Sequence, residues 1–287
     1  MNIILLVNDD VSYSSLLAYP TLKHFSKSIS GIFVQDGILN SENSSSDIFN
    51  KVKKKSGFRY AQNLVLEILS YKIAILVRNL FRMNKHEDDC YVETNTKLGK
   101  IFKIPVFQIK GSIHDKIWLE KIIKLKPELI ICIRYAEILK KPLLEIPEKG
   151  VINFHPSLLP KYKGLGPVFQ AFVHDEKEIG FSFHYINENI DEGEIITQKK
   201  IKIKKNDSVS RLTISAHVLG GFELLSIIKT IENNTVHTLK KLKTEENYFS
   251  WPEKEQVKKF FESNKKYILL RDFISLVFYN PKNFCYE

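Results

Sequence analysis

Residues 151–196 read VINFHPSLLPKYKGLGPVFQAFVHDEKEIGFSFHYINENIDEGEII, and this stretch carries the most structural information in the chain. Its apolar start is typical of a buried strand, which must end at His155-Pro156 because proline lacks a backbone donor and fixes φ. Asn153 and His155 are two positions apart, so a strand places both side chains on one face. We therefore expect an amide and an imidazole together at the carboxyl end of a strand, where open α/β sheets build their sites.

A turn-like cluster, Asn189–Gly193, follows between two strand-like runs, Gly180–Ile186 and Glu194–Ile203. This loop can return Asp191 to the vicinity of His155. An imidazole, a carboxylate and an amide are together sufficient for acyl transfer, as base, orienting group and oxyanion donor. Each residue also has a plainer explanation, since a histidine can simply end a strand and an aspartate often shapes a turn.

The ordered motifs of this stretch resemble those of the formyltransferases that use 10-formyltetrahydrofolate. The motifs are Asn153–Pro160, Tyr162–Gly164 and Asp191–Gly193. The resemblance extends over roughly residues 100–230, and the family includes glycinamide ribonucleotide, methionyl-tRNA and amino-sugar formyltransferases. It implies that the catalytic residues are Asn153, His155 and Asp191. It also implies 10-formyltetrahydrofolate as co-substrate, and nothing in the chain suggests a set of metal ligands.

The expected fold class is α/β: a Rossmann-like formyltransferase fold with a mixed, mostly parallel sheet flanked by helices, plus a small C-terminal appendage. The expected domains are a catalytic domain at 1–232, with a helical insert at about 36–100, and a short extension at 233–287. Predicted strands include Ile3–Val7, Ile32–Val34, Ile104–Phe107 and Leu129–Ile133. Predicted helices lie around Ser12–Ser28, Arg59–Arg82, Asp115–Leu125, Asp207 or Ser208 to Glu232, and Glu253–Glu262. Gly220-Gly221 inside the longest of them indicates close packing against a neighbour.

Two loops should hold the folate, because the family grips the pterin ring mainly with backbone groups that correspond here to 134–139 and 186–191. The predicted cofactor-binding residues are Arg134, Tyr135, Glu137, Ile138, Leu139, Ile186, Asn187 and Asn189. The family commonly has a small residue where Arg134 stands. The sequence leaves open whether Arg134 lines the pocket or points away, and whether His184 supports the site or only packs.

The predicted acceptor-binding residues are Asn8, Lys161 and Lys163, of which the two lysines suit a phosphate or merely a solvated loop. The first turn, after Ile3–Val7, lacks the glycines of a phosphate-cradling loop, which argues against glycinamide ribonucleotide. About 55 residues follow Glu232, too few for the C-terminal barrel of methionyl-tRNA formyltransferases. We therefore expect the acceptor to be the primary amine of a nucleotide-linked or phosphorylated amino sugar.

Three other activities compete with this prediction. Methionyl-tRNA formyltransferase-like activity is favoured by the net charge of +10, because basic surfaces bind RNA, although a lysine-rich proteome explains the same charge. Hydrolysis of formyltetrahydrofolate is a second alternative, although the family's hydrolases carry an N-terminal regulatory domain not expected here. A basic RNA-binding protein on a disabled scaffold would have no use for the complete catalytic set.

The composition is that of an ordinary globular protein, with 44% hydrophobic and 26% charged residues among 287. Three cysteines show no CxxC spacing, and Cys132 lies in an apolar run, which favours a reduced thiol and a cytoplasmic location. His86 and Cys90 stand four apart, as two metal ligands on a helix could, but a solvated helix end explains them better. The polar stretch 36–58 is expected to be a mobile surface segment.

The helix predicted around Arg59–Arg82 is apolar on two sides, so both sides should be covered. One side carries Val65, Leu69, Ile73, Leu76 and Leu80, and the other carries Leu64, Ile68 and Ile75. The family core has no obvious equivalent of this helix, so we expect it beside the sheet. Homodimer contact, peripheral contact with an anionic membrane, or packing within the monomer could supply the cover.

Overall fold

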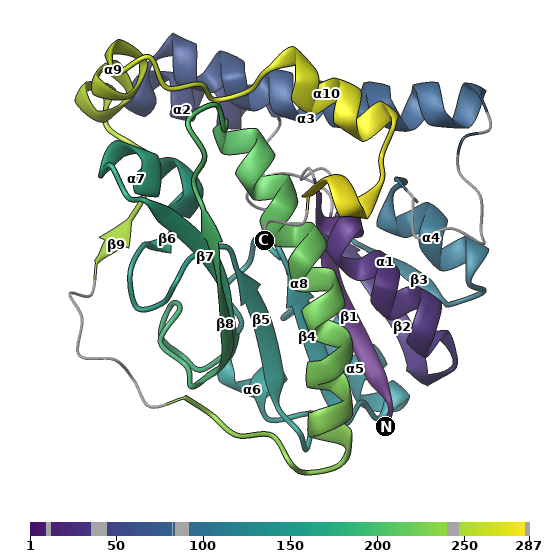
Figure 1. Cartoon of the computed structure of the whole chain (residues 1–287). Coiled ribbons are helices and arrows are strands. Elements are labelled where there is room, and N and C mark those ends of the chain that lie inside the picture. The colour runs from purple at the N-terminus through teal and green to yellow at the C-terminus, as the bar shows by residue number, and fades with distance from the viewer. Residues whose placement is uncertain (10–12, 36–44, 82, 84–91, 240–246, 285–287) are drawn as a thin grey trace.

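The strands of the computed structural model form two sheets (Figure 1). They are β1 (Ile3–Asn8), β2 (Ile29–Gln35), β3 (Val106–Ile109), β4 (Leu129–Ile133), β5 (Val151–His155), β6 (Lys163–Gly164), β7 (Glu178–Tyr185), β8 (Ile195–Lys202) and β9 (Tyr248–Phe249). The larger sheet has the order β3-β2-β1-β4-β5-β7-β8, in which the first five strands are parallel and the β5–β7 and β7–β8 pairs are antiparallel. This sheet confirms the predicted mixed, mostly parallel fold. The smaller sheet pairs β6 with β9.

Helices connect and cover these strands. They are α1 (Ser14–Phe25), η1 (Ser26–Ser28), α2 (Ser45–Ser56), α3 (Phe58–Leu80), α4 (Asn95–Ile101), α5 (Lys116–Leu125), α6 (Lys141–Leu144), α7 (Pro167–Val173), α8 (Val209–Glu232), α9 (Lys254–Glu262), α10 (Leu270–Val277) and η2 (Pro281–Phe284). Ser208 caps α8, as predicted, by accepting a hydrogen bond from Arg211 N at 3.0 Å. The structure describes residues 1–9, 13–35, 45–81, 83, 92–239 and 247–284, so the pair His86 and Cys90 lies outside the described residues.

β1 shows why the central strands are continuous apolar runs. Ile3, Leu5 and Val7 belong to the core cluster beneath α1 and α8, whereas Ile4 and Leu6 belong to the cluster on the other face, which includes residues of α5. Because helices cover both faces of the parallel strands, neither set of side chains meets water, and the alternation of apolar and polar residues disappears. The predicted central strand is confirmed as β4.

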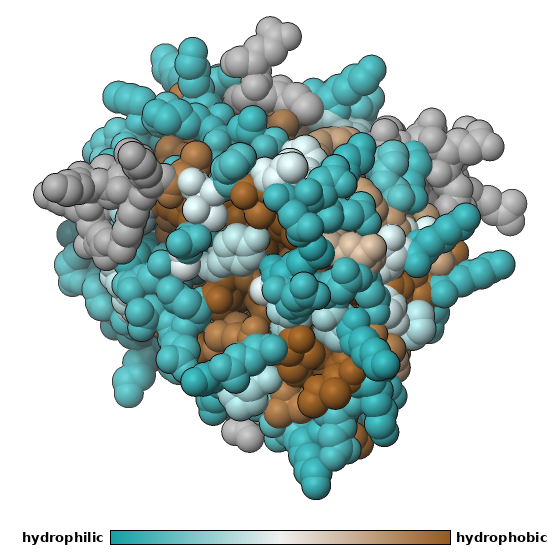
Figure 2. All heavy atoms as spheres, turned by 90° about the horizontal axis from the view of Figure 1, so that it is seen from below, coloured by the Kyte–Doolittle hydropathy of each residue, from teal (hydrophilic) through white to brown (hydrophobic). Residues whose placement is uncertain are grey.

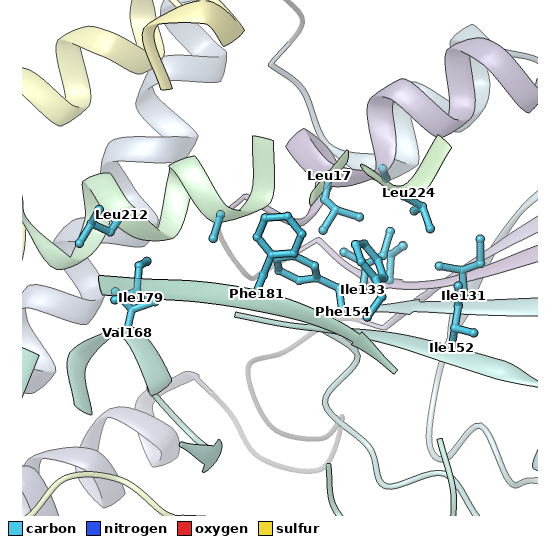
Figure 3. Close-up of a cluster of buried hydrophobic side chains, with 14 of the residues drawn as sticks. Leu17, Ile131, Ile133, Ile152, Phe154, Val168, Ile179, Phe181, Leu212 and Leu224 are labelled. Carbon is cyan, nitrogen blue, oxygen red and sulfur yellow. The ribbon is translucent and has the colours of Figure 1, made fainter. Parts of the chain in front are cut away.

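The two glycines inside α8 mark its closest approaches to the rest of the core. A Cβ on Gly220 would lie 2.5 Å from Cε2 of Phe154, and a Cβ on Gly221 would lie 2.9 Å from the carbonyl oxygen of Leu17. Figure 3 shows Phe154 and Phe181 rising from the sheet toward α8. Close packing is therefore the reason for the two glycines, as the sequence predicted.

The stretch 36–58 is not simply a polar surface segment, because it contains the helix α2. Val52 on this helix is fully buried, while Lys51, Lys53 and Lys54 are exposed. Among the side chains of this helix that the structure describes, Val52 is the one buried apolar residue, and one apolar position among lysines and serines makes a weak periodic signal. The sequence therefore did not indicate a helix. The first nine residues of the stretch lie outside the described residues.

The expectation that the insert helix lies beside the sheet is wrong. In Figure 1 the parallel strands point upward, and α3 runs across the top, along their carboxyl ends. Leu64 and Ile68 on its inner side line the same pocket as Asn153 and His155 of β5. The sides of the sheet are already covered by α1, α8 and α5, so the carboxyl edge is the place left for the apolar inner side of α3.

The C-terminal segment packs onto the rest of the chain. Phe260 and Tyr267 belong to the same core cluster as residues of β1, β4 and β5. α10 lies alongside α3 (Figure 1), and Nη1 of Arg78 on α3 donates to the carbonyl oxygen of Val277 at 2.7 Å. These contacts make the segment part of the structure around the carboxyl edge of the sheet.

Replacing Gly220 with alanine tests the close approach of α8. We expect Gly220→Ala to lower the free energy of unfolding by about 1–3 kcal/mol, because the added methyl group overpacks the space against Phe154. Urea denaturation measures this change. The matched variant Lys229→Ala, at an exposed position of the same helix, should stay within about 0.5 kcal/mol of wild type. A Gly220→Ala protein as stable as wild type would contradict the packing, since helix propensity alone favours alanine.

Candidate active site

β5 presents two polar side chains to one side of the sheet. Asn153 and His155 both line a pocket of about 460 Å³ at the carboxyl edge. Phe154, between them, points to the opposite side and packs beneath α8. His155 is 6% exposed and Asn153 is half-buried, so both are held by the protein while one side of each stays open to the pocket. The same-face arrangement follows from the strand's period of two.

The loop after β7 brings Asp191 to this pocket. Its backbone is left-handed, with φ of 54°, and its Oδ2 accepts a hydrogen bond from the Gly164 amide at 2.9 Å. Oδ2 also lies 3.6 Å from Nδ1 of His155, and Oδ1 lies 3.6 Å from Nε2 of His184. The carboxylate therefore sits between two imidazoles and is fixed by a backbone donor.

The hydrogen bonds define how His155 is oriented. Its Nε2 donates to the carbonyl oxygen of Tyr162 at 2.9 Å, which leaves Nδ1 facing the carboxylate of Asp191. A proton that arrives on Nδ1 would be stabilised by that carboxylate. The pair is thus arranged to hold or pass a proton at the pocket wall.

His184 supports Asn153 from the neighbouring strand, with which it pairs directly in the β5–β7 register. Nδ1 of His184 donates to the carbonyl oxygen of Tyr185 at 2.8 Å, and Nε2 lies 3.2 Å from Nδ2 of Asn153. Burial lowers the pKa of His184 to about 4, although Asp191 opposes this effect. The neutral ring therefore accepts a hydrogen bond from Asn153 and orients its amide.

Asp191 stays ionised in spite of its burial. Burial alone would raise the pKa of its carboxyl group, but the imidazole of His155 and the amide of Gly164 outweigh burial and hold the pKa below its ordinary value. His184 and Lys163 add to this effect. The site thus keeps a permanent negative charge next to His155 at neutral pH.

The sequence comparison decides the family. The family model described as formyl transferase matches residues 80–227, which is half of the chain. The chain belongs to the formyl transferase family. Among curated relatives, the methionyl-tRNA formyltransferase of Alkaliphilus oremlandii is 35% identical over 145 residues, which cover 50% of this chain and 46% of the relative. The methionyl-tRNA formyltransferase of Ehrlichia ruminantium is 37% identical over 114 residues, which cover 40% of this chain and 38% of the relative. The match therefore spans less than half of each relative's length.

Solved structures of formyl transferases share the fold. The N-formyltransferase from Helicobacter canadensis, in complex with folinic acid and dTDP-3-aminofucose, has a TM-score of 0.56 at 17% identity and covers 94% of this chain and 85% of its own. The phosphoribosylglycinamide formyltransferase from Anaplasma phagocytophilum has a TM-score of 0.56 at 17% identity and covers 86% and 97%. These similarities confirm the Rossmann-like formyltransferase fold.

Some of the residues predicted to hold the folate line this pocket. Arg134, Tyr135 and Ile138, from the loop after β4, are among the lining residues. The others are not among them: Glu137, Leu139, Ile186, Asn187 and Asn189. Glu137 instead accepts from the amide of Ile113 at 2.9 Å, and Leu139 is buried in the core on the α5 side of the sheet. Arg134 thus lines this pocket, and its contact with the folate stays a prediction.

The predicted acceptor-binding residues lie outside the lining of this pocket. Lys163 is buried and pairs with Glu192 at 2.8 Å. Lys161 pairs with Glu176 at 3.1 Å and lines a second cavity of about 450 Å³. Asn8 is fully buried at the end of β1. Binding of an acceptor phosphate by the two lysines stays a prediction, and it would require them to leave their acidic partners.

Two distant segments form pocket walls that the sequence did not assign to the site. From α3 come Tyr60, Leu64, Glu67 and Ile68, and from the C-terminal segment come Tyr248, Trp251 and Tyr267. The β6–β9 pairing fastens the second group, because Tyr248 and Phe249 pair with Lys163 and Gly164 in the loop after β5. The aromatic run near 248–251 was the available signal, but nothing in the sequence indicates which loop it joins.

Glu67 and Arg134 both line the pocket, and each influences the pKa of the other. Burial raises the pKa of Glu67 to about 7. Arg134 and the hydroxyl of Tyr267 lower this pKa but do not outweigh burial, and the hydroxyl donates to Oε2 at 3.3 Å. Burial also lowers the pKa of Arg134, and its Nε has no hydrogen-bond partner among the described atoms. The pocket is therefore lined by a guanidinium group whose Nε has no partner in the described structure, and by a carboxyl group whose pKa is raised to about 7.

No group of three or more His, Cys, Asp or Glu side chains in the described part of the chain is placed to hold a metal ion. Cys132, on β4, is a buried thiol without a disulfide partner, and burial raises its pKa. The polar groups that line the pocket include the amide of Asn153, the imidazole of His155, the carboxyl groups of Asp191 and Glu67, and the guanidinium group of Arg134.

The high pKa of Glu67 predicts a pH-dependent stability. Between pH 4.5, its ordinary pKa, and about 7, the folded protein retains a proton that the unfolded chain has lost. Because the folded state binds more protons in this window, stability falls as the pH rises through it. Glu67→Gln removes this loss. The free energy of unfolding of the variant, relative to that of wild type, should therefore rise by up to about 3 kcal/mol between pH 4.5 and pH 7.5.

Thermal or urea unfolding at a series of pH values measures this difference. The matched control is Glu255→Gln, at an exposed position of α9, whose stability relative to wild type should hardly change over the same range. A constant difference between Glu67→Gln and wild type from pH 4.5 to 7.5 would show that Glu67 does not titrate in this window.

Proposed function

We propose that this chain transfers the formyl group of 10-formyltetrahydrofolate to a primary amine. The observation that carries the proposal is the convergence of Asn153, His155 and Asp191 on one pocket, with Asp191 Oδ2 3.6 Å from His155 Nδ1. Membership of the formyl transferase family supports it. The curated relatives match only about half of the chain, so the activity of the whole chain is part of the proposal.

Each catalytic residue has a role that follows from its contacts. One amide hydrogen of Asn153 is directed to His184, so the other is available to donate to the formyl oxygen as negative charge develops there. The imidazole of His155 adds electrostatic stabilisation, and its Nδ1 faces the carboxylate of Asp191. This pair takes up the proton that the attacking amine must lose, directly or through a water molecule, and passes it to N10 of the folate as the bond between N10 and the formyl carbon breaks.

The polar groups that line the pocket are suited to binding a folate. Nε of Arg134 and the hydroxyl of Tyr135 are buried without hydrogen-bond partners in the described structure, and both residues line the pocket. Such atoms are costly unless a ligand or water satisfies them. A pterin ring offers several donors and acceptors. The Helicobacter canadensis relative in complex with folinic acid supports the same choice of co-substrate.

The acceptor that we propose is a nucleotide-linked amino sugar. Tyr248 and Trp251 line the pocket on the side of the C-terminal segment, and Tyr248 is 58% exposed. Exposed aromatic rings provide surfaces on which a nucleobase can stack. The structure of the Helicobacter canadensis enzyme with dTDP-3-aminofucose, which covers 94% of this chain, supports this class of acceptor.

Methionyl-tRNA is the second candidate acceptor, favoured by the similarity to methionyl-tRNA formyltransferases and by the net charge of +10. The two acceptors differ in their dependence on salt. Affinity for tRNA should fall steeply with ionic strength because many phosphates are contacted, whereas one diphosphate gives a shallow fall. Formate released without any acceptor would instead indicate hydrolysis.

Substitution of the three polar residues tests the activity. We expect Asn153→Ala, His155→Ala and Asp191→Asn each to lower kcat by about 10²- to 10³-fold, because each removes a group that acts in the transition state. Formation of tetrahydrofolate, followed by absorbance, measures the rate, and circular dichroism checks the fold. The control His237→Ala, at an exposed position, should keep wild-type activity. Activity within severalfold of wild type in any of the three would remove that residue from the mechanism.

A panel of acceptors tests the substrate class. We expect efficient transfer to a dTDP- or UDP-linked amino sugar and little to charged initiator tRNA. Tyr248→Ala should raise KM for the sugar nucleotide about tenfold by removing the stacking surface, whereas Tyr248→Phe keeps the ring and should behave as wild type. Transfer to tRNA alone would overturn the choice of acceptor but leave the formyl transfer itself intact.

A further inference from the structure

Formyl transfer removes two protons from the acceptor. A primary amine is present in neutral solution mainly as an ammonium ion, because the pKa of such groups is about 8 to 10. The nitrogen must lose one proton before it can attack the formyl carbon, and a second one once the new bond has formed. His155 and Asp191, whose facing atoms are 3.6 Å apart, pass the second proton to N10 of the folate. The first proton is left for another group.

Glu67 carries the other carboxyl group of the pocket. Among the described residues that line this pocket, only Asp191 and Glu67 have a carboxyl group. The carboxylate of Asp191 already faces His155 and His184, and it accepts a hydrogen bond from a backbone amide. Glu67 comes from a different segment, the helix α3, and is therefore the candidate for a second role in proton transfer.

The strand register brings the neighbour of Glu67 to the catalytic strand. Ile133 of β4 pairs with Phe154 of β5, so the next residues on these adjacent parallel strands are Arg134 and His155. Adjacent strands lie about 4.8 Å apart. Arg134 and Glu67 line the same pocket, and each influences the pKa of the other. One acceptor molecule in the pocket can therefore meet both Glu67 and His155.

Tyr60 connects Glu67 with the loop that holds Asp191. Its ring lies 5.5 Å, between centroids, from the ring of Tyr267, whose hydroxyl donates to Oε2 of Glu67 at 3.3 Å. A Cβ on Gly166 would lie 3.4 Å from the hydroxyl oxygen of Tyr60, and the glycine two residues earlier donates its amide to Asp191. The two carboxyl groups therefore belong to one continuous wall of the pocket.

Glu67 is shielded from bulk water. Hydrophilic side chains lie open to solvent over much of the lower face of the molecule (Figure 2), whereas Glu67 is 8% exposed. Burial raises its pKa to about 7. This value is closer to the pKa of an amine than that of an ordinary carboxyl group is. Transfer of a proton from an ammonium group to Glu67 is therefore correspondingly less unfavourable.

The other charged and titratable groups that act on Glu67 come from three segments. Arg134 follows β4, Tyr13 precedes α1, and Tyr267 and Asp272 belong to the C-terminal segment. The guanidinium group and the two tyrosine hydroxyls lower the pKa of Glu67, Asp272 raises it, and burial outweighs the lowering effects. An ammonium group that enters the pocket adds a positive charge, which favours the carboxylate form of Glu67 that receives it.

We propose, on the basis of the proposed formyl transfer, that Glu67 binds the ammonium group of the acceptor and takes its first proton. An N–H bond of the ammonium group breaks, an O–H bond forms on the Glu67 carboxylate, and the electron pair stays on the nitrogen. That pair then forms the bond to the formyl carbon. The second proton reaches N10 through His155 and Asp191, and the first passes from Glu67 to solvent. One proton is thus released for each formyl group transferred to an ammonium ion.

The pH dependence of Glu67→Gln tests this role. The acceptor is the one that wild type uses best among dTDP- and UDP-linked amino sugars and charged initiator tRNA, and kcat/KM is measured from about pH 6 to about pH 9. Glutamine cannot take a proton, so the variant can use only amine that has lost its proton in water. The ratio of wild-type to variant kcat/KM should be about 10² at pH 7 and fall roughly tenfold for each pH unit above it. Ionisation of groups that both proteins share cancels in this ratio.

Two further variants accompany this measurement, and circular dichroism checks that each is folded. Glu67→Asp keeps a carboxyl group and should be at least about tenfold more active than Glu67→Gln at pH 7. Glu255→Gln, at an exposed position of α9, should match wild type at every pH.

Two results would overturn the role of Glu67 and leave formyl transfer intact. One is wild-type activity in Glu67→Gln. The other is a deficit that does not change with pH, because a purely structural effect of Glu67 on the pocket lowers the rate equally at every pH. Absence of formyl transfer by wild type to every acceptor would instead remove the proposed function, and this role with it.

Discussion

The antiparallel pairing of β5 with β7 is the constraint on which the catalytic site depends. Its register sets Asn153 opposite His184, and the loop that leaves β7 carries Asp191 back to His155. Because side chains alternate along a strand, a slip of one residue would turn both polar side chains of β5 toward α8 and Phe154 toward the pocket. The close packing of Phe154 beneath Gly220 opposes that slip, so the core on one side of the sheet holds the site on the other.

The sequence predicted those parts of the site that depend on local pattern. A strand that ends at a proline and a period of two were enough to place Asn153 and His155 together, and the turn cluster was enough to suggest the return of Asp191. The two outer walls were not predictable in this way. Glu67 has the sequence context of any charged residue on an amphipathic helix, and the segment containing Tyr248 pairs with a loop some 85 positions earlier. Contacts over such separations leave no periodic signal in either partner.

Glu67 and Arg134 bring together segments that lie far apart in the sequence. Arg134 follows β4, Glu67 lies on α3, and Tyr267 of the C-terminal segment donates a hydrogen bond to Oε2 of Glu67 at 3.3 Å. All three residues line the pocket, where the positive charge of Arg134 favours the ionised form of Glu67 and burial opposes it. The insert helix and the C-terminal segment therefore contribute to the electrostatics of the pocket.

α3 connects this pair to the outer surface of the molecule. A helix that is apolar on two sides is usually buried, and α3 instead uses one side for the pocket wall and leaves the other exposed. Its inner side is fixed by contacts to α10, so a new partner can be added only outside. Any partner that binds the folded helix and not its locally unfolded form stabilises the helix by mass action. Because Leu64 and Ile68 lie on the same helix, that stabilisation also reaches the wall of the pocket, although the partner never touches the substrate.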